Sequence, residues 1–355
     1  MLTTDLIERI LAAIPSKTVG LLGDLFLDRY LDIDPALDEP SVETGLTAYQ
    51  VTRVRSYPGA LGTVMNNLAA LGVGRIYPIA IIGDDGEGYE LRQALGRLPA
   101  VDPGGLVVAP DRRTPTYTKP MRGTEELNRL DIKNRTPTPA ALEDAVLKLL
   151  DESWPRLDAL IVLDQVSEED CGVVTKRVRD RLAVVANGDP AKFVLTDSRE
   201  RIGLFRNVCT KPNRRELLGC LSEPLQTEQL MAYAAEQGMR YEDLEFTLSV
   251  LNLDDKTGRV VFGTDGANGI RLIPYPRTSY TSVIAIPAYP VTGPIDICGA
   301  GDSCSAGITC AMVSGVTPEQ AAAFGNLVAS ITIQQIGTTG TASPEQVRQR
   351  WKEVQ

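Results

Sequence analysis

Short apolar runs alternate with amphipathic segments along most of this chain. The runs rich in aliphatic residues predict buried strands, at residues 18–23, 76–82, 157–163, 192–196 and 247–252. Segments with apolar residues three or four positions apart predict helices, at residues 1–14, 63–71, 87–98, 138–150 and 168–182. The alternation of strands and helices favours an α/β protein whose sheet is largely parallel.

Two helices near the C-terminus are predicted from their first residues. The segments Thr317–Gln320 and Ser343–Gln346 each combine a hydroxyl N-cap with a proline at the first helical position. Each also has a glutamine that can return a hydrogen bond to the cap. These segments predict helices over 318–335 and 344–353.

Two segments interrupt the alternation, at 31–57 and 112–133. The first is acidic and then strand-like, and the second contains two strand-like runs around Gly123. Together they predict a small β-sheet that covers one edge of the core as a lid, with two ordinary surface hairpins as the alternative. The predicted core then consists of residues 1–30, 58–111 and 134–355.

The composition narrows the chemistry that this chain can perform. Its 355 residues include 36 lysines and arginines against 46 acidic residues, a net charge of −10, so we expect no nucleic-acid partner. The chain has no histidine, which excludes Ser-His-Asp catalysis, Cys-His catalysis and histidine-ligated zinc. A general base must therefore be Asp, Glu, Lys, Tyr or Cys.

The cysteines and the apolar stretches predict a cytoplasmic protein. Six cysteines occur without any C-x-x-C pair, which favours reduced and mostly buried thiols over a zinc ribbon or a disulfide scaffold. No apolar run reaches the roughly 18 residues of a membrane span. The N-terminal segment carries charges among its apolar positions, so we expect no signal peptide.

A glycine turn that opens a helix carries the clearest chemical signal, in the sequence DICGAGDSCSAG at Asp296–Gly307. Free backbone N–H groups at such a helix start, together with the helix dipole, form an anion site. Asp302 lies at the mouth of this site, where a carboxylate can accept the proton of a hydroxyl that attacks a phosphoryl group. The alternative is an ordinary helix start with Asp302 as a capping residue.

This segment resembles the D-T-x-G-A-G-D motif of the ribokinase-like, PfkB-type carbohydrate kinases, with Ile297 in place of the threonine. The resemblance implies a three-layer α/β/α core with a mostly parallel sheet and a small β-sheet lid. It also implies that Asp302 is the catalytic base and that Gly299, Ala300 and Gly301 surround the transferred phosphoryl group. The cofactors that it implies are ATP and Mg²⁺, and a requirement for a monovalent cation stays open.

The sequence GDLFLDRY at Gly23–Tyr30 is similar to the heptose-7-phosphate kinase branch of this family. The resemblance implies that Asp24 binds sugar hydroxyls, and we assign Asp28 to the same substrate site. A carboxylate at the end of a strand can accept hydrogen bonds from two neighbouring hydroxyls. The alternative is that Asp24 and Asp28 cap the next turn.

The sequence PGALGTVMNNLAALG at 58–72 resembles the first motif of the family. Gly59 and Asn67 match the family pattern, whereas Ala60 and Thr63 replace a glycine and an asparagine. We expect all four positions to approach the acceptor, and the two replacements leave its identity open. Alone, the segment is equally typical of a glycine-rich turn that enters a core helix.

Further segments resemble the nucleotide side of the family. Asn213 and Glu216 match P-N-x-x-E, which implies contact with Mg²⁺ and the ATP phosphates, mostly through water. The same pattern is compatible with Asn213 as a helix N-cap and Glu216 as the third residue of that helix. The other implied ATP-binding positions are Thr264, Gly266, Gly269 and Asn326. The loop that holds the first three is also typical of a simple hairpin turn.

Two basic residues of the predicted lid are candidates for binding a phosphorylated sugar. Lys119 and Arg129 lie in segments that resemble P-T-I-T-K and Q-L-I-R-L-D of the heptose kinase branch. Their charge suits a phosphate group. The alternative is that both are solvated surface charges.

The matched segments extend over roughly residues 15–350 and predict an ATP-dependent kinase for a hydroxyl of a sugar or sugar phosphate. We expect a homodimer through the lid and no membrane partner. One alternative is a protein of this fold that binds a nucleotide or sugar phosphate as a regulator with little or no turnover. Another is a kinase for a nucleoside or a free hexose. We expect no adenylyltransferase domain after residue 355 and therefore the kinase function alone.

Overall fold

The computed structural model describes residues 2–220, 231–232, 234–235, 240–273 and 283–355. Over these residues the larger sheet has nine strands in the order β16-β15-β14-β13-β12-β11-β1-β6-β7. Pairing is parallel from β14 to β7, whereas β15 and β16 are antiparallel at one edge. In chain order the strands are β1 Thr18–Gly23, β6 Arg75–Gly83, β7 Leu106–Ala109, β11 Ala159–Asp164, β12 Phe193–Ser198, β13 Cys209–Thr210, β14 Val261–Thr264, β15 Ile270–Ile273 and β16 Ile284–Ile286.

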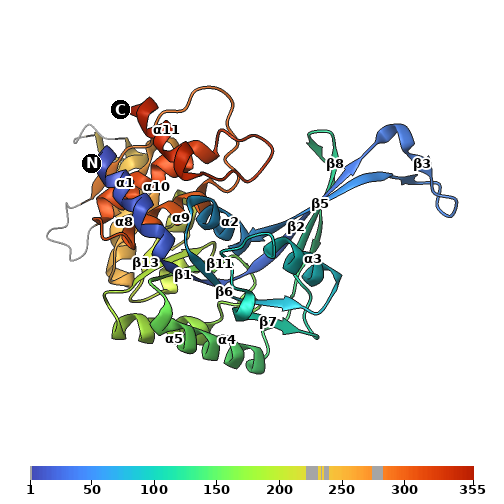
Figure 1. The fold of residues 1–355 in the computed structure, drawn as a ribbon, viewed down its shortest axis with the longest axis horizontal. Helices are drawn as coiled ribbons and strands as arrows, with labels where there is room; N and C mark the ends of the chain where they lie inside the picture. Colours follow the sequence, from blue (N-terminus) through green and yellow to red (C-terminus); the bar gives the residue numbers. More distant parts are fainter. Residues whose placement is uncertain (1, 221–230, 233, 236–239, 274–282) are drawn as a thin grey trace.

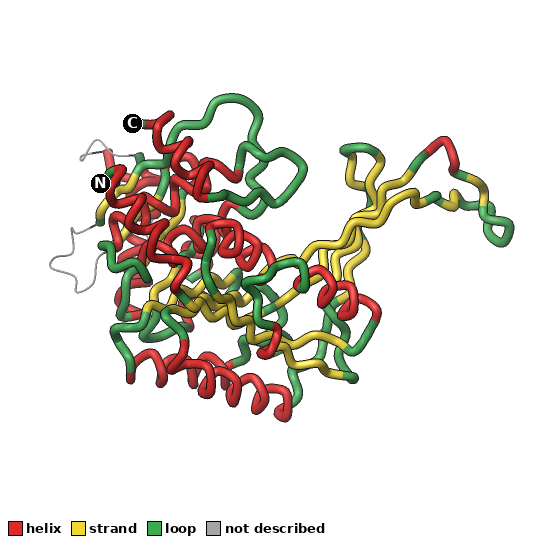
Figure 2. The backbone as a smooth tube through the Cα atoms, in the orientation of Figure 1, coloured by secondary structure: helices red, strands yellow, loops and turns green. Residues whose placement is uncertain are grey.

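Helices cover both faces of this sheet (Figures 1 and 2). Side chains alternate along each strand, so Leu21 and Leu22 of β1 belong to two different apolar clusters. The helices of the first cluster are α1 Thr4–Ala13, α2 Leu61–Leu71, α3 Gly86–Leu95, α9 Ala300–Met312, α10 Pro318–Thr332 and α11 Pro344–Val354. The helices of the second are α4 Ala140–Ser153 and α5 Lys176–Gly188. The predicted three-layer α/β/α core is confirmed.

A third, smaller cluster lies at the antiparallel edge of the large sheet. It joins helices α6 (Arg214–Gly219) and α8 (Tyr241–Thr257) to β14 and β15. The hairpin predicted around residues 264–269 is confirmed, since β14 pairs antiparallel with β15.

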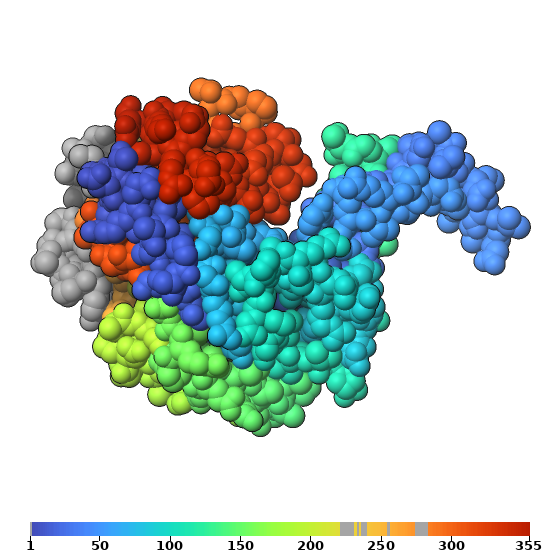
Figure 3. Space-filling model, viewed as in Figure 1, coloured from blue at the N-terminus to red at the C-terminus, as the bar shows by residue number. Residues whose placement is uncertain are grey.

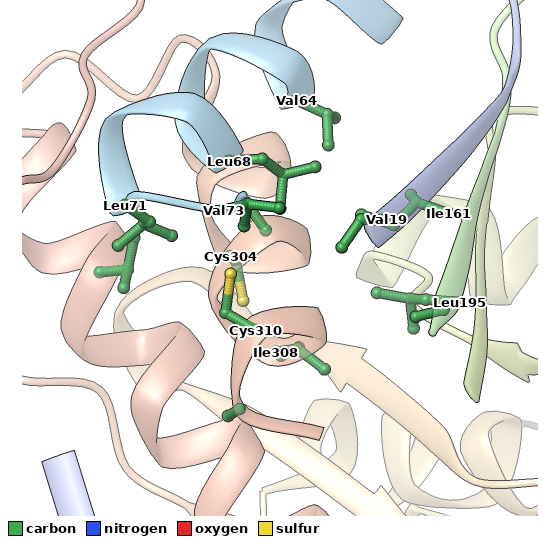
Figure 4. Packing of buried hydrophobic residues seen from close by; sticks show 14 of the residues in the cluster. Val19, Val64, Leu68, Leu71, Val73, Ile161, Leu195, Cys304, Ile308 and Cys310 are labelled. Carbon is green, nitrogen blue, oxygen red and sulfur yellow. The ribbon is translucent and has the colours of Figure 1, made fainter. Parts of the chain in front are cut away.

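Helix α9 packs closely against α10 because small residues meet at their interface. A Cβ atom on Gly307 of α9 would lie 3.0 Å from the Cα of Gly325 of α10, which is closer than carbon atoms normally pack. Cys304 and Ile308 of α9 also share one buried cluster with Val64 and Leu68 of α2 (Figure 4). This packing fixes the first turn of α9 relative to α2 and the sheet.

The second sheet has the strand order β10-β8-β2-β5, with β9 paired to β8. It leaves the main body as a protruding arm, which ends in the small sheet β3-β4 (Figures 1 and 3). Its strands are β2 Leu25–Ile33, β5 Val51–Ala60, β8 Thr116–Arg122, β9 Glu125–Glu126 and β10 Leu130–Ile132, and the tip has β3 Glu39–Pro40 and β4 Thr47–Ala48. The predicted small sheet is therefore present. It begins at Leu25 rather than at residue 31, because β2 follows β1 with only Asp24 between them.

Two predictions of secondary structure are wrong. The run at 247–252, predicted as a strand, lies inside α8, where the buried Phe246, Val250 and Leu253 follow helical spacing over a longer window. The helix predicted over 168–182 begins only at Lys176. The segment before it stays irregular because its Val173 amide donates a hydrogen bond to the Asp24 carboxylate.

Other sequence predictions agree with the structure. Both predicted capping boxes, Thr317–Gln320 and Ser343–Gln346, are formed. All six cysteines are unpaired, and four of them are buried. In the described parts of the chain, no helix has the length and apolar character needed to cross a membrane.

Candidate active site

The N-terminal turn of α9 forms an open end of backbone amides. Gly299 has a φ of 77°, which turns the chain into the helix. The Ala300 amide donates to the Ile297 carbonyl at 3.1 Å, whereas no acceptor within the described residues takes the amides of Gly299, Gly301 or Asp302. We predicted an anion site formed by the amides of Gly299, Ala300 and Gly301. Among the described residues, the amides of Gly299 and Gly301 have no acceptor, and neither has the amide of Asp302. These groups and the helix dipole favour an anion here.

The carboxyl group of Asp302 lies in this first helical turn and is partly buried. Burial, together with the Asp197 carboxylate, raises the pKa of Asp302 to about 7, although Lys211 and Arg199 act in the opposite direction. A carboxyl group with a pKa near neutrality can accept a proton at physiological pH and release it again. The environment of Asp302 therefore suits a general base.

A buried ion pair lies beside the same helix end. Lys211 and Asp197 are 2.8 Å apart, and their side chains are only 4% and 10% exposed. The Lys211 Nζ lies 3.5 Å from the position that a Cβ on Gly301 would take. Sequence reasoning did not assign Lys211 a role, although it directly precedes the Pro212-Asn213 match. A buried cation at the positive end of a helix is unfavourable unless anions face it, and Asp197 is one such anion.

The predicted magnesium residues lie at the start of α6, where they form a capping box. The Asn213 amide and side-chain nitrogen donate to the Glu216 carboxylate at 2.8 and 2.7 Å, and the Glu216 amide donates to the Asn213 Oδ1. Burial raises the pKa of Glu216 to about 7, with a further contribution from Asp197. The expected N-cap is thus present, and the side-chain oxygens of both residues accept hydrogen bonds within it.

These donors fit a magnesium ion that keeps most of its water. No group of three or more Cys, Asp or Glu residues in the described chain is arranged to hold a metal directly. Mg²⁺ is commonly bound through one or two carboxylates together with substrate phosphates and water. Glu216 and Asn213 match that pattern, so the residues present are compatible with the ion.

The other residues predicted to bind ATP lie in segments that contact one another. The Thr264 amide donates to the Pro212 carbonyl at 2.8 Å, which joins the hairpin loop to the segment before α6. Gly269 has a φ of 87°, and a Cβ there would lie 2.1 Å from the Ile286 carbonyl oxygen. Asn326 donates to the same carbonyl at 3.2 Å, so its amide anchors β16. Gly266, also with a positive φ, completes the turn.

Asp24 links β1 to the loop after β11. Its carboxylate accepts the amides of Gln165, Val166 and Val173 at 2.8 to 3.0 Å, and the residue is 3% exposed. Burial and the nearby Asp164 raise the pKa of Asp24 to about 6 despite these hydrogen bonds. Three of the acceptor positions of this carboxylate are therefore already used by the backbone.

Asp28 and the two predicted lid cations belong to charge pairs within the second sheet. Lys119 Nζ lies 3.6 Å from Asp28 and donates to the Tyr30 hydroxyl at 3.2 Å. A Cβ on Gly59 would lie 2.3 Å from the Asp28 carboxylate, so a larger residue there would displace that carboxylate. Arg129 donates to both oxygens of Asp131 at 2.7 and 3.0 Å. Neither Asp24 nor Asp28 caps a turn, because β2 is a strand.

The start of α2 meets the start of α9. A Cβ on Gly299 would lie 3.3 Å from the methyl group of Thr63, so the two helix ends are in contact. Asn67 donates to the Thr63 carbonyl at 2.9 Å, and its buried Oδ1 has no hydrogen-bond partner in the described chain. Ala60, at the glycine position of the motif, has a φ of 51°. Thr63 therefore lies beside the first turn of α9, which carries Asp302.

A small cavity of about 50 Å³ opens between the two sheets. It lies at the carboxyl ends of β1, β11 and β12, the edge at which open α/β sheets bind ligands. Asp24, Tyr117 and Arg199 are among its lining residues. Sequence reasoning missed Arg199, and its position two residues after Asp197 was the available signal.

Solved structures share this fold. The ribokinase of Arabidopsis thaliana complexed with ribose and ATP aligns over 95% of this chain and 98% of its own, with a TM-score of 0.61 and 16% identity. A putative ribokinase II from E. coli in complex with ATP and Mg²⁺ aligns over 95% and 99%, with a TM-score of 0.63 and 14% identity. The fold is therefore ribokinase-like, an α/β architecture with a second small sheet.

The sequence comparisons define the family. The model of the pfkB family carbohydrate kinases matches residues 27–346, so the chain belongs to this family. The bifunctional protein HldE of Caulobacter sp. (strain K31) is 28% identical over 345 residues, which are 97% of this chain and 64% of that protein. The chain thus spans less than two thirds of the length of this relative. The predicted resemblance is confirmed at the level of the family.

Proposed function

We propose that the protein transfers the γ-phosphoryl group of ATP to a hydroxyl of a sugar or sugar phosphate. The observation that carries this proposal is Asp302, whose pKa is raised to about 7, beside the free amides of Gly301 and its own backbone. In this reaction the Asp302 carboxylate takes the hydroxyl proton. The hydroxyl oxygen forms a bond to the γ-phosphorus, and the bond to the β-phosphate oxygen breaks, so that ADP leaves with the electron pair.

Charge stabilisation comes from groups that are already in place. The amides at the start of α9 face the oxygens of the phosphoryl group as its charge spreads. The Lys211 ammonium lies behind the same turn, where Asp197 holds it. Asn213 and Glu216 would hold Mg²⁺ through water, and the bound ion supplies neutralisation of the phosphate charge. A monovalent-cation requirement stays a prediction.

The comparisons support the acceptor class and leave its members open. One structural neighbour was solved with ribose and ATP, and the sequence relative is a bifunctional protein of which this chain spans 64%. Because the segment Gly23–Tyr30 resembles the heptose-7-phosphate kinase branch, a heptose 7-phosphate is the first acceptor to test. The replacements Ala60 and Thr63 alter the predicted acceptor side, so hexose phosphates, free sugars and nucleosides belong in the same panel.

The test is a coupled assay of ADP formation with Mg²⁺ and this panel. We expect transfer to one acceptor class, and a loss of about 10²- to 10⁴-fold in kcat for Asp302→Asn, because general-base catalysis contributes about that much. ATP affinity measured by calorimetry should change little in this variant. Wild-type turnover by Asp302→Asn would overturn the role of Asp302. Tight ATP binding with no transfer to any acceptor would favour the regulatory alternative.

We also propose that the second sheet covers the site and pairs two copies of the chain. Large apolar side chains on it are exposed, with Val54 at 55% and Leu130 at 63%. Such a surface is unfavourable in water unless something covers it. Light scattering at micromolar concentration tests the homodimer, and a Val54→Asp variant should shift it toward monomer. A monomeric wild-type chain would contradict this proposal. The cytoplasmic location likewise stays a prediction.

A further inference from the structure

A groove lies between the edge strand of the second sheet and helix α3, at the base of the protruding arm (Figure 1). Its volume is about 320 Å³, which falls within the size range of small-molecule sites. One wall consists of residues 53–57 of β5, the last strand in the order of that sheet, and the other consists of α3 together with Arg97 beyond its end. Leu91 and Leu95 anchor α3 in the core, so this β5–α3 groove lies where the arm meets the main body.

Two cations of the β5–α3 groove have no partner among the described residues. Arg53 lies on the β5 wall and Arg97 on the α3 wall, both are exposed, and neither side chain forms a hydrogen bond or an ion pair there. The third arginine of the lining, Arg55, already donates to both oxygens of Asp32, at 2.9 and 2.7 Å. Arg53 helps to lower the pKa of Asp32 but forms no ion pair with it. The groove therefore offers one uncompensated guanidinium group on each wall.

The acidic residue of the lining is already neutralised. Glu90 pairs with Arg29 of β2 at 2.5 Å and accepts the Ser56 hydroxyl at 2.7 Å. The groove is therefore positive, although the whole chain has a net charge of −10. A local concentration of one charge in a cleft attracts small ligands of the opposite charge.

Neutral side chains add hydrogen-bond donors to the α3 wall. Tyr89 is 59% exposed and brings a hydroxyl, and the exposed Gln93 brings an amide. A guanidinium group presents two parallel N–H donors, which match the oxygens of a phosphate or a carboxylate. The lining thus suits an anion that reaches both walls.

We propose that the β5–α3 groove binds a small organic dianion, whose two charged ends are phosphate or carboxylate groups held by Arg53 on one wall and Arg97 on the other. The inference goes beyond the proposed function and does not depend on it, since neither arginine belongs to the site at α9. The bonds of Glu90 to Arg29 and Ser56 already join α3 to the second sheet, so both walls are in place before a ligand arrives. The bound dianion adds a second bridge between the arm and the core.

The first test measures binding to the full chain by calorimetry, with probes that differ in their number of charged ends. 3-Phosphoglycerate has a phosphate and a carboxylate, whereas glycerol 3-phosphate and glycerate each keep only one of them. We expect 3-phosphoglycerate to bind about tenfold more tightly than either single-ended compound, since a hydrogen bond to a charged group contributes about that much. Succinate and 1,3-propanediol bisphosphate then distinguish a carboxylate ligand from a phosphate ligand. Equal affinities for the single-ended and double-ended compounds would overturn the inference.

Variants of the two arginines assign this binding to the groove. Arg53→Ala and Arg97→Ala should each weaken 3-phosphoglycerate binding about tenfold, so that it binds no more tightly than the single-ended compounds. Arg97→Lys keeps the charge and should lose less. Arg92→Ala removes an exposed arginine of α3 that does not line the groove, and it should change nothing. An alanine variant that binds 3-phosphoglycerate as tightly as the wild type would overturn the inference. Thermal unfolding confirms that each variant is folded, which exposed substitutions should not impair.

Hydrogen exchange locates the ligand without any substitution. Saturating 3-phosphoglycerate should slow amide exchange over residues 53–57 and 89–97 and leave the first turn of α9 unchanged. Protection at the starts of α9 and α6 instead would place the ligand in the candidate active site and overturn the inference.

A second copy of the chain is the competing occupant of the groove, because the exposed Val54, a proposed dimer contact, also lines it. In that case the wild type is a dimer by light scattering, no dianion binds to it, and Arg97→Ala shifts it toward monomer. This combination would overturn the inference and support the proposed pairing. Binding of the dianion to wild-type chain of either oligomeric state, lost in Arg97→Ala, would support the inference.

Discussion

The first turn of α9 and the second sheet both carry predicted substrate contacts, but their charged groups differ in how far they are already neutralised. Beside α9, Lys211 pairs with Asp197, whereas Asp302 and Glu216 have no ion pair among the described residues and have pKa values raised to about 7. In the second sheet Lys119 and Arg129 each face a carboxylate of the same sheet. The first region therefore contains carboxyl groups with raised pKa values, whereas the two cations of the second region are paired with carboxylates.

This difference separates chemistry from scaffolding. Groups with raised pKa values lie where a reaction needs a proton acceptor, because burial and like charges disfavour their ionised form. The Arg129–Asp131 pair is partly exposed, so its interaction with water limits its energetic value, whereas the Lys119–Asp28 pair is mostly buried. A basic residue in a motif therefore indicates a ligand contact only if its charge has no partner in the folded chain.

The largest contrast should appear when one cation is removed from each region. Lys211→Met leaves Asp197 buried without its partner, so we expect a loss of about 3–5 kcal/mol in the free energy of unfolding. Arg129→Ala breaks a partly exposed pair and should cost less than about 1 kcal/mol. Chemical denaturation of both variants measures the two values. Similar losses in the two variants would remove the distinction between the regions.

The pH dependence of activity sharpens the contrast further. Because only the ionised Asp302 accepts a proton, kcat/KM should rise about tenfold per pH unit up to pH 7 and then level off. The raised pKa of Asp302, about 7, sets this limb, whereas an unburied aspartate would place it near pH 4. Initial rates across overlapping buffers between pH 5 and 9 measure it.

A matched variant shows whether Asp302 or Glu216 causes the rise of kcat/KM with pH. Glu216 also has a pKa raised to about 7, so Glu216→Gln should keep the limb if Asp302 is responsible. Lys211→Met, measured at a temperature where it stays folded, should move the limb to higher pH, since the nearby cation that favours ionised Asp302 is gone. A limb near pH 4 in the wild type would exclude Asp302 as a buried base.

The smallest expected effect concerns the junction between the two regions. Ala60 connects β5 to α2 with a φ of 51°, a conformation that a side chain disfavours. Ala60→Gly should raise the free energy of unfolding by about 0.5 kcal/mol, the relief of strain less the added freedom of the unfolded chain. Ala69→Gly within α2 should lower it by about 0.5–1 kcal/mol. Thermal unfolding compares the pair, and a loss in both variants would show that Ala60 is unstrained.

The sequence predicted the core well where its signal was local. The short apolar runs of β1, β6 and β11 and the capping boxes of α10 and α11 depend on neighbouring residues alone. The failures arose where distant residues decide: Val173 donates to Asp24 instead of starting a helix, and residues 247–252 join a helix whose buried face becomes evident only over its full length.

In the candidate site, too, some features follow from neighbouring residues and others from contacts between distant segments. The order Gly299-Ala300-Gly301-Asp302 by itself determined a helix start with an open amide end and a carboxyl group, because those properties follow from adjacent residues. Only the tertiary structure decided that Lys211 lies beside that turn and that Lys119 and Arg129 are paired with carboxylates. Charge pairing depends on which segments the fold brings within a few ångströms, and a linear sequence does not contain that distance.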